Sequence, residues 1–287
     1  MQAPPLRPQQ TGHPLVQRAC LVIPQHEPGG YHAGGASPTP SSGFAWDVSG
    51  RRKALIPTGS GTSPTTKGVI ANAGRAWLFD GVNQNLSAQH AGQHPNALNS
   101  GYTVAFAMQA IAAPSAAKFE DVFGGGGGPG SYPIFRWSST SGTTRQAWLH
   151  RSGVQAKIAG SALSGGVTYF VTATWDKVTV KVYLDGIFSV SVADTASGYL
   201  GSPNKFCNIG AQLGTTAPFN GNVGHLVVLP WALPAQAVAA LVAAMRGRHD
   251  HISPSFLKFF RQWPLRFHGH NRFTGGMQDA TGGFLEG

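Results

Sequence analysis

The segment KVTVKVYLDGIFSVSV, residues 177–192, constrains the fold more than any other stretch of this chain. Its first half has an apolar residue at every second position: Val178, Val180, Val182 and Leu184. This period of two residues is typical of a β-strand with one buried face. Asp185-Gly186 supplies the residues of a hairpin turn, and apolar residues continue after it. The segment therefore predicts an antiparallel ribbon in a sheet that is covered on one side.

The length of the hairpin loop decides which side chains share a face. A two-residue loop at Asp185-Gly186 would put the apolar residues of the two strands on opposite faces. A three-residue loop over residues 184–186, with Gly186 left-handed in a bulge, would pair Val182 with Phe188 and Val180 with Val190. We expect the three-residue loop because it gathers the apolar side chains on one face.

The rest of the chain also favours strands over helices. With 39 Gly and 20 Pro among 287 residues, and only 11% charged residues, many turns and short strands are expected. Besides the ribbon, apolar patterns predict strands at 76–79, 85–88, 102–111, 132–137, 145–151, 154–159, 167–175, 205–209 and 222–229. Residues 234–246 have helical spacing and predict one short helix that caps an end of the structure. About ten strands without alternating helices indicate an all-β sandwich or barrel.

Composition divides the chain into three parts. Residues 1–75 are rich in Pro, Gly, Ser and Thr and predict an extended arm that is ordered only by packing on something else. Residues 76–246 hold the predicted strands and helix, and residues 247–287 form a basic, aromatic tail. The two cysteines, Cys20 and Cys207, have no metal-site or redox-pair spacing, and their state, bridged or free, stays open.

The tail contains one amphipathic pattern. Four aromatic residues recur at helical spacing, and two basic residues flank them: Phe256, Phe259, Phe260 and Trp263, with Lys258 and Arg261. We expect this segment to be a helix whose aromatic face docks onto a protein partner. The formal net charge of +10 leaves contact with a membrane surface or lipopolysaccharide, and binding of nucleic acid, as alternatives. We expect no nucleic acid partner and no transmembrane segment.

Four motifs in a fixed order resemble a known family. They are AWLFDGVNQNLSA at 76–88, SGYTVAFAMQ at 100–109, VTYFVTATWDKVTVKVYLDGIFSVSV at 167–192, and FCNIGAQ followed by APFNGNVGHLVVLPWALPAQAVAALV within 206–242. Together they resemble the laminin-G-like jelly-roll domains of the concanavalin A-like lectin/glucanase superfamily, in particular those of tailed-bacteriophage structural proteins. The resemblance covers about residues 75–246.

The resemblance implies an antiparallel two-sheet jelly-roll sandwich whose apolar strand faces form the core. Its expected interior residues are Trp77, Phe79, Phe106, Phe170, Val180, Val182, Phe188, Val190 and Val227. It also implies calcium as the one cofactor to consider, and the candidate oxygen ligands are Asp80, Asn83, Asp185 and Asn220. Both Asp residues precede Gly, so ordinary turns are the alternative.

A sugar site is a second implication of the resemblance. Trp137, Trp148 and Tyr132 offer flat rings that match the apolar face of a pyranose, and Asn204 and Asn220 offer hydrogen bonds. The alternative is that the aromatic residues belong to the core and the asparagines to turns.

Catalysis is not expected. The glucanase members use clustered carboxylates in a Glu-x-Asp-x-x-Glu pattern, whereas the glutamates here are Glu27, Glu120 and Glu286, none with that spacing. A Gly-x-Ser-x-Gly elbow for a serine nucleophile is also missing from the sequence. The histidines of His249-Asp250-His251 are more readily explained as solvated tail residues than as zinc ligands.

These patterns and the resemblance together suggest a non-enzymatic bacteriophage virion protein, either a capsid decoration or a tail or fibre accessory. Its sandwich would stand on the virion surface while the terminal segments dock to neighbouring subunits, as a homo-oligomer or with other virion proteins. It would be made in the host cytoplasm without a signal peptide. The alternatives are a carbohydrate-binding adhesin for host surface polysaccharide and a divergent glycosidase.

Overall fold

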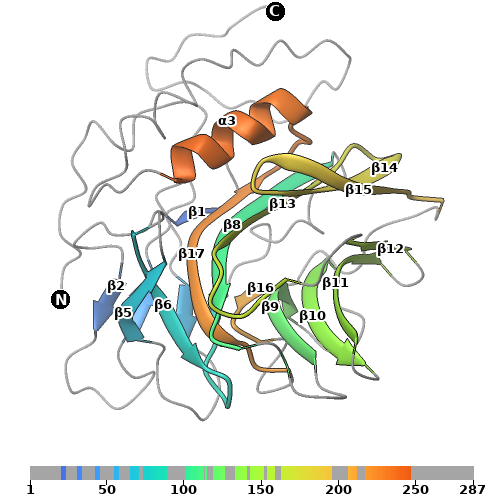
Figure 1. Cartoon of the computed structure of the whole chain (residues 1–287). Helices are drawn as coiled ribbons and strands as arrows, with labels where there is room; N and C mark the ends of the chain where they lie inside the picture. Colours follow the sequence, from blue (N-terminus) through green and yellow to red (C-terminus); the bar gives the residue numbers. More distant parts are fainter. Residues whose placement is uncertain are drawn as a thin grey trace, which may run out of the picture.

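A computed structural model of the chain describes a set of segments that lie mostly between residues 65 and 246 (Figure 1). The described residues are 21–23, 31–33, 43–45, 55–57, 65–70, 74–88, 101–112, 114, 119–126, 133–140, 143–151, 154–158, 163–195, 206–211 and 217–246. Within them, every pair of neighbouring strands is antiparallel.

The strands form two sheets packed face to face. The first sheet has eight strands in the order β15 (Ile187–Ala193), β14 (Thr179–Leu184), β13 (Tyr169–Trp175), β8 (Tyr102–Ala110), β17 (Asn220–Leu229), β6 (Gly74–Asp80) and β5 (Thr65–Ile70), with β1 (Leu21–Ile23) also on β17. The second has nine, in the order β12 (Val154–Lys157), β11 (Thr143–Arg151), β10 (Ile134–Thr140), β9 (Phe119–Gly126), β16 (Phe206–Ile209), β7 (Leu86–Ala88), β4 (Leu55–Pro57), β3 (Gly43–Ala45) and β2 (Tyr31–Ala33). The predicted all-β sandwich is confirmed.

The main core fills the space between the sheets, because alternate residues of each strand point inward. Of the expected interior residues, five lie in this core: Trp77, Phe79, Phe106, Val180 and Val182. Val190 packs against it and is partly buried. Phe170 and Val227 are buried too, but on the opposite face of the first sheet. Phe188 is 53% exposed, so its assignment to the core was wrong.

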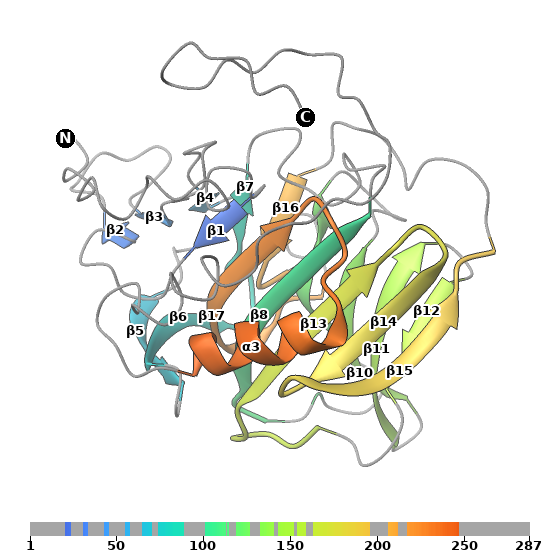
Figure 2. The same ribbon diagram turned by 90° about the horizontal axis from the view of Figure 1, so that it is seen from above.

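One helix, α3 (Ala235–Met245), covers part of the outer face of the first sheet (Figure 2). Its apolar side chains form a second buried cluster with outward-facing residues of that sheet, among them Ala105, Phe170, Tyr183, Val227 and Leu229. The helix was predicted at the right place in the sequence, but it lies across a sheet rather than at an end of the sandwich. The reason is that the outer face here is apolar and needs a cover.

The β14–β15 hairpin differs from its predicted register. Leu184 pairs with Ile187, so the loop has two residues, and Asp185 and Gly186 have φ values of 55° and 85°. Positive φ at both positions is the geometry of a type I′ turn. The extra residue sits inside β15, where the register shifts between Val182↔Val190 and Tyr183↔Phe188. The expected three-residue loop was therefore wrong, since a bulge in the strand restores the apolar face instead.

Segments of the first 75 residues also belong to the sandwich. β5 pairs with β6, β1 with β17, and β4 with β7. These parts of the predicted arm therefore pack on the chain's own sheets. The sheets extend beyond the predicted boundary at residue 75.

The turn between β13 and β14 gives a small stability prediction. Lys177 has a φ of 78°, and Asp176 Oδ1 accepts hydrogen bonds from Val178 N at 3.0 Å and Thr179 N at 2.7 Å. A left-handed backbone costs a residue with a Cβ roughly 1–2 kcal/mol, part of which glycine loses again as chain entropy. Lys177→Gly should raise the free energy of unfolding by about 1 kcal/mol in urea titrations. Lys177→Ala is the control and should not raise the free energy of unfolding. An equal rise in both variants would mean that the lysine side chain, and not the left-handed backbone, destabilises the turn.

Candidate functional site

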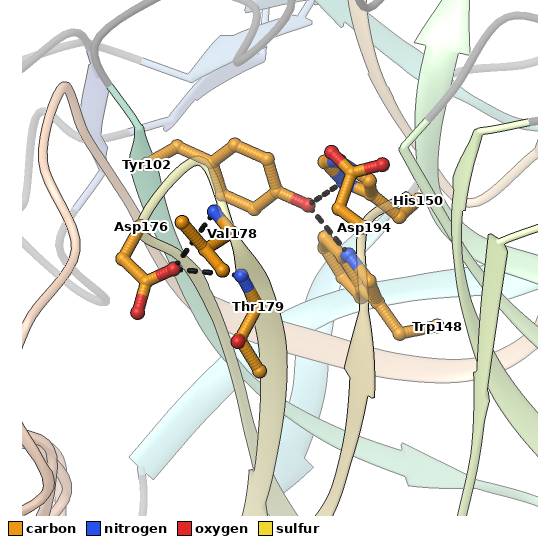
Figure 3. Close-up of polar contacts among 7 residues, drawn as sticks. All are labelled: Tyr102, Trp148, His150, Asp176, Val178, Thr179 and Asp194. Carbon is orange, nitrogen blue, oxygen red and sulfur yellow. Dashed lines mark hydrogen bonds and ion pairs between the residues drawn. The ribbon is translucent and has the colours of Figure 1, made fainter. Parts of the chain in front are cut away.

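A chain of hydrogen bonds joins the two sheets at one end of the sandwich (Figure 3). Trp148 Nε1 donates to Tyr102 Oη at 2.8 Å, and that hydroxyl lies 2.7 Å from His150 Nδ1. His150 Nε2 lies 3.2 Å from Asp194 Oδ2. We call these four residues the Tyr102 chain.

The Tyr102 chain assembles from distant elements. Tyr102 begins β8 of the first sheet, whereas Trp148 and His150 lie in β11 of the second, and Asp194 follows β15. Because an indole N–H can only donate, the Tyr102 hydroxyl accepts from Trp148 and can give its own proton to His150 Nδ1. That assignment leaves a proton on His150 Nε2 for Asp194.

This order of Asp, His and hydroxyl resembles a proton relay, but it is closed to a substrate. The side chains of His150 and Asp194 are 0% and 1% exposed, and Tyr102 is fully buried. The Trp175 ring centroid lies 4.8 Å from that of His150 and 5.8 Å from that of Tyr102. The Tyr102 chain therefore ties the two sheets together.

The opposite end of the sandwich presents polar groups to solvent around Asn220. Asp80 and Asn220 are paired across β6 and β17. Asp80 Oδ1 accepts hydrogen bonds from Val82 N at 2.9 Å and Asn83 N at 3.3 Å, which shapes the turn. Gly81 has a φ of 72°, and a Cβ there would come within 2.7 Å of Asn220 Cβ. Glycine is needed so that the turn can lie against Asn220.

The second sheet contributes to the same end. Glu120 Oε2 accepts a hydrogen bond from Asn220 N at 3.3 Å, and Ile111 N donates to Asn220 O at 3.0 Å. Phe119 is 41% exposed, and the Arg136 guanidinium carbon lies 4.3 Å from its ring centroid. Val82 and Ile111 are exposed as well. We call this group the Asn220 end: Asp80, Val82, Asn83, Ile111, Phe119, Glu120 and Asn220.

A partly buried ion pair in the second sheet lies next to Phe119. Arg136 binds Asp121 through two hydrogen bonds, Nε to Oδ1 at 2.7 Å and Nη2 to Oδ2 at 3.0 Å. Burial raises the pKa of the Asp121 carboxyl group, while the hydrogen bonds and charge of Arg136 oppose that rise. The pair fixes the guanidinium that lies over Phe119.

The predicted sugar platform is not on the surface. Trp137 and Trp148 are both 0% exposed within the core, so a sugar cannot stack on them, and the core alternative was right for both. Asn220 lies at the Asn220 end. Tyr132 and Asn204 lie outside the described residues. The residues that the sequence reasoning missed here are Phe119 and Glu120, because no strand was predicted over β9.

The four candidate calcium ligands do not come together. Asp80, Asn83 and Asn220 share the Asn220 end, but Asp185 is in the β14–β15 turn, where it accepts from Phe170 N at 3.1 Å and pairs with Arg246 at 3.3 Å. In the described part of the chain, no group of three or more His, Cys, Asp or Glu side chains could hold a metal ion. Asp80 is the one carboxylate among the candidates at that end, and its Oδ1 already accepts hydrogen bonds from two N–H groups, which is a poor match for calcium. The four candidates do not form a calcium site together.

The predicted docking residues, Phe256, Lys258, Phe259, Phe260, Arg261 and Trp263, lie outside the described residues. Among the helices of the described segments, none has the length and apolar character needed to cross a membrane.

Comparisons with known proteins agree with this architecture. A laminin G-type family model, described as the concanavalin A-like lectin/glucanases superfamily, matches residues 80–239. Among solved structures, the binding domain of botulinum neurotoxin DC in complex with SialylT aligns with a TM-score of 0.54 and 10% identity, over 80% of this chain and 52% of that one. Trypanosoma rangeli sialidase in complex with the inhibitor DANA gives 0.52 and 15%, over 83% and 37%. At these identities the likeness shows the fold alone, and the chain spans about half or less of these two proteins. No curated protein sequence matches the chain.

Proposed function

Since this chain belongs to the concanavalin A-like lectin/glucanase superfamily, we propose that it is a non-enzymatic protein that binds carbohydrate at its Asn220 end. The observation that carries the proposal is an exposed aromatic ring, Phe119, in the residue before Glu120, whose side chain in turn contacts the backbone of Asn220 at the same end of the sandwich. An aromatic ring stacks on the apolar face of a pyranose, and amide and carboxylate oxygens accept hydrogen bonds from its hydroxyl groups. One structural relative, the botulinum neurotoxin DC binding domain, was solved in complex with SialylT, which agrees with this class of ligand.

The Asn220 end also has the rigidity that sugar binding needs. Arg136 is held by Asp121 and in turn lies against Phe119, so the ring is fixed before a ligand arrives. Asp80 and Glu120 accept hydrogen bonds from backbone N–H groups, which fixes the loops around Asn220. Groups that are held in place lose little conformational entropy on binding.

The arrangement of the described acids supports a non-enzymatic role. Asp121 is buried and bound to Arg136 through both carboxylate oxygens. His150 and Asp194 are sealed inside the sandwich. Asp80 and Glu120 are engaged by main-chain groups, whereas a glycosidase needs one carboxyl group free to donate a proton and another free to attack or activate water.

A glycan array with the full-length chain tests the proposal. Phe119→Ala should weaken binding of the recognised glycan by about tenfold or more, because it removes the stacking ring. Val178→Ala is the matched control, since Val178 is an exposed apolar residue at the other end of the sandwich, and it should bind like the wild type. If the Phe119→Ala variant binds the glycan as well as the wild type does, the Asn220 end is not the binding site. Release of reducing ends from the bound glycan would show a glycosidase instead.

We also propose that the protein is a structural component of a bacteriophage virion, displayed on the capsid or the tail. The motif resemblance and the composition of residues 1–75 and 247–287 support this location. The ligand of the Asn220 end would then be a host surface polysaccharide, and synthesis would take place in the host cytoplasm. Antibodies against the chain should label purified particles in electron micrographs, and the full-length chain should form an oligomer in light scattering. Unlabelled particles and a monomeric chain would contradict this location.

A further inference from the structure

The first sheet ends in a strand, β15, that lacks the usual protection of a sheet edge. Within the described segments, β15 pairs with β14 alone and is the outermost strand of its sheet (Figure 1). One row of its backbone N–H and C=O groups therefore points away from the sheet. Natural edge strands are usually short, bulged, or supplied with a lysine or proline that keeps another strand from pairing there. β15 has seven residues, IFSVSVA, and contains neither a charged residue nor a proline.

The other outermost strands of the described sheets each have one of these protections. At the far edge of the first sheet, β5 contains Lys67, and its pairing with β6 has a register shift. In the second sheet, β12 contains the exposed Lys157, and β2 has only three residues. β15 also has a bulge, but it lies near the hairpin turn, and residues 190–193 pair regularly with β14. Among these four strands, β15 alone combines length with an uncharged edge.

The main core is also incompletely covered along β15. Val180 and Val182 of β14 are 0% exposed. Val192 and Val190, which are paired with them on the same face, pack against the same core but are only partly buried. A further strand beside β15 would cover these two valines, and removing apolar surface from water is favourable. The edge therefore offers apolar contact as well as backbone hydrogen bonds.

We propose that β15 pairs antiparallel with β15 of a second copy of this chain, about a two-fold axis at Ser191. A two-fold axis perpendicular to the sheet keeps the core faces of both copies on one side, so two paired residues must face the same way. Pairing Ser191 with its own copy meets this condition, because Val190 then lies opposite the partner's Val192. The valines of each copy complete the rim of the other's core, and the first sheet continues from one copy into the next.

The distribution of charge favours a second copy as the occupant of this edge. With a formal net charge of +10, two copies of the chain repel each other over most approaches. A two-fold pairing also sets each residue close to its own copy, so any charge near the axis would meet a like charge. Residues 187–193 carry none, and the ammonium group of Lys181, on the neighbouring strand, lies 3.8 Å from a carboxylate oxygen of Asp176. At this edge the two copies can therefore approach without placing like charges opposite each other.

The pairing deepens the homo-oligomer that we propose for a virion component, and it rests on that part of the proposed function. It uses none of the residues of the Asn220 end. A Ser191 variant should therefore bind glycan as the wild type does, whatever its state of association.

Sedimentation velocity of the full-length chain over a concentration series tests the pairing. The wild type should form a dimer, and Ser191→Lys should raise its dissociation constant by about tenfold or more, because two ammonium groups then lie opposite each other at the axis. Ser191→Thr is the matched control, since it keeps the exposed position uncharged, and it should dimerise like the wild type. A wild type that stays monomeric at every concentration would overturn the pairing. An oligomer that Ser191→Lys leaves intact would also overturn it, while leaving the virion proposal standing.

A mixing experiment tests the position of the two-fold axis. Ser191→Glu alone should be as monomeric as Ser191→Lys, but an equimolar mixture of the two variants should dimerise again, because lysine then meets glutamate across the axis. Recovery in the mixture also shows that each variant is folded, since a misfolded chain would not regain its partner on mixing. If both variants and their mixture are monomeric, Ser191 does not lie opposite its own copy, and the proposal is overturned.

Discussion

Replacing His150 with leucine is expected to lower the free energy of unfolding by about 3 kcal/mol or more. The substitution keeps a buried side chain of similar volume but removes both ring nitrogens. Asp194 then keeps a carboxyl group that is 1% exposed and has lost the imidazole, and the Tyr102 hydroxyl loses Nδ1. Because the Tyr102 chain joins β8, β11 and the end of β15, the loss weakens contact between the sheets rather than one strand. Urea unfolding followed by far-UV circular dichroism measures the change.

A double-mutant cycle separates the lost interaction from the lost packing. His150→Leu with Asp194→Leu removes both partners, so that no buried carboxylate is left without the imidazole, and part of the lost stability should return; the Tyr102 hydroxyl still lacks Nδ1, so the recovery should be incomplete. Tyr102→Phe should cost less, about 1–2 kcal/mol, because it removes a hydroxyl and leaves Trp148 Nε1 without its acceptor. If the double variant is as unstable as the sum of the two single variants, His150 and Asp194 do not interact in the fold.

The sandwich could be predicted because its evidence is local. The alternation in β14, the apolar runs of β8 and β13, and the helical spacing of 234–246 each show in a few consecutive residues. The strand β9 was missed because it includes Gly124, Gly125 and Gly126, which resemble a loop in the sequence. Those glycines pair with β16. Gly124 is buried, and an added Cβ there would lie 3.5 Å from Ile134. Only the neighbouring strands show that the glycines belong to a sheet.

The candidate site could be predicted only in part, because some of its residues stand in local turn motifs whereas others are brought together by strands far apart in the sequence. The asparagine and aspartate at the Asn220 end stand in turn motifs, so Asp80, Asn83 and Asn220 were found. Glu120 reaches Asn220 from a strand 100 residues away, and Tyr102 reaches His150 over 48 residues. The two tryptophans, Trp137 and Trp148, have strand positions that fit a sugar platform as well as a core. The two interpretations differ in which face of the strand is covered, and the position of the opposite sheet decides this.

Replacing Arg136 with methionine is expected to cost about 3–5 kcal/mol at neutral pH, because it leaves the Asp121 carboxylate buried without its partner. The cost should depend on pH in a defined direction. Burial raises the pKa of Asp121 above its ordinary value of 3.8, and Arg136 opposes the rise. Without Arg136 the pKa rises further. The folded variant therefore binds a proton more readily than the unfolded chain does, and the cost is fully present above the folded-state pKa.

That cost disappears as the pH falls through the folded-state pKa towards the ordinary value, since both states are then protonated. The stability difference between Arg136→Met and the wild type should shrink as the pH is lowered from 7 to about 4. Arg136→Met with Asp121→Asn is the matched control, because asparagine has no proton to gain, and its difference from the wild type should not shrink in this way. A deficit in the single variant that stays constant over this range would mean that lost packing of the arginine stem, rather than an unpaired carboxylate, destabilises the fold. Glycan binding of the same variant gives a second reading, because Phe119 has then lost the guanidinium that holds its ring.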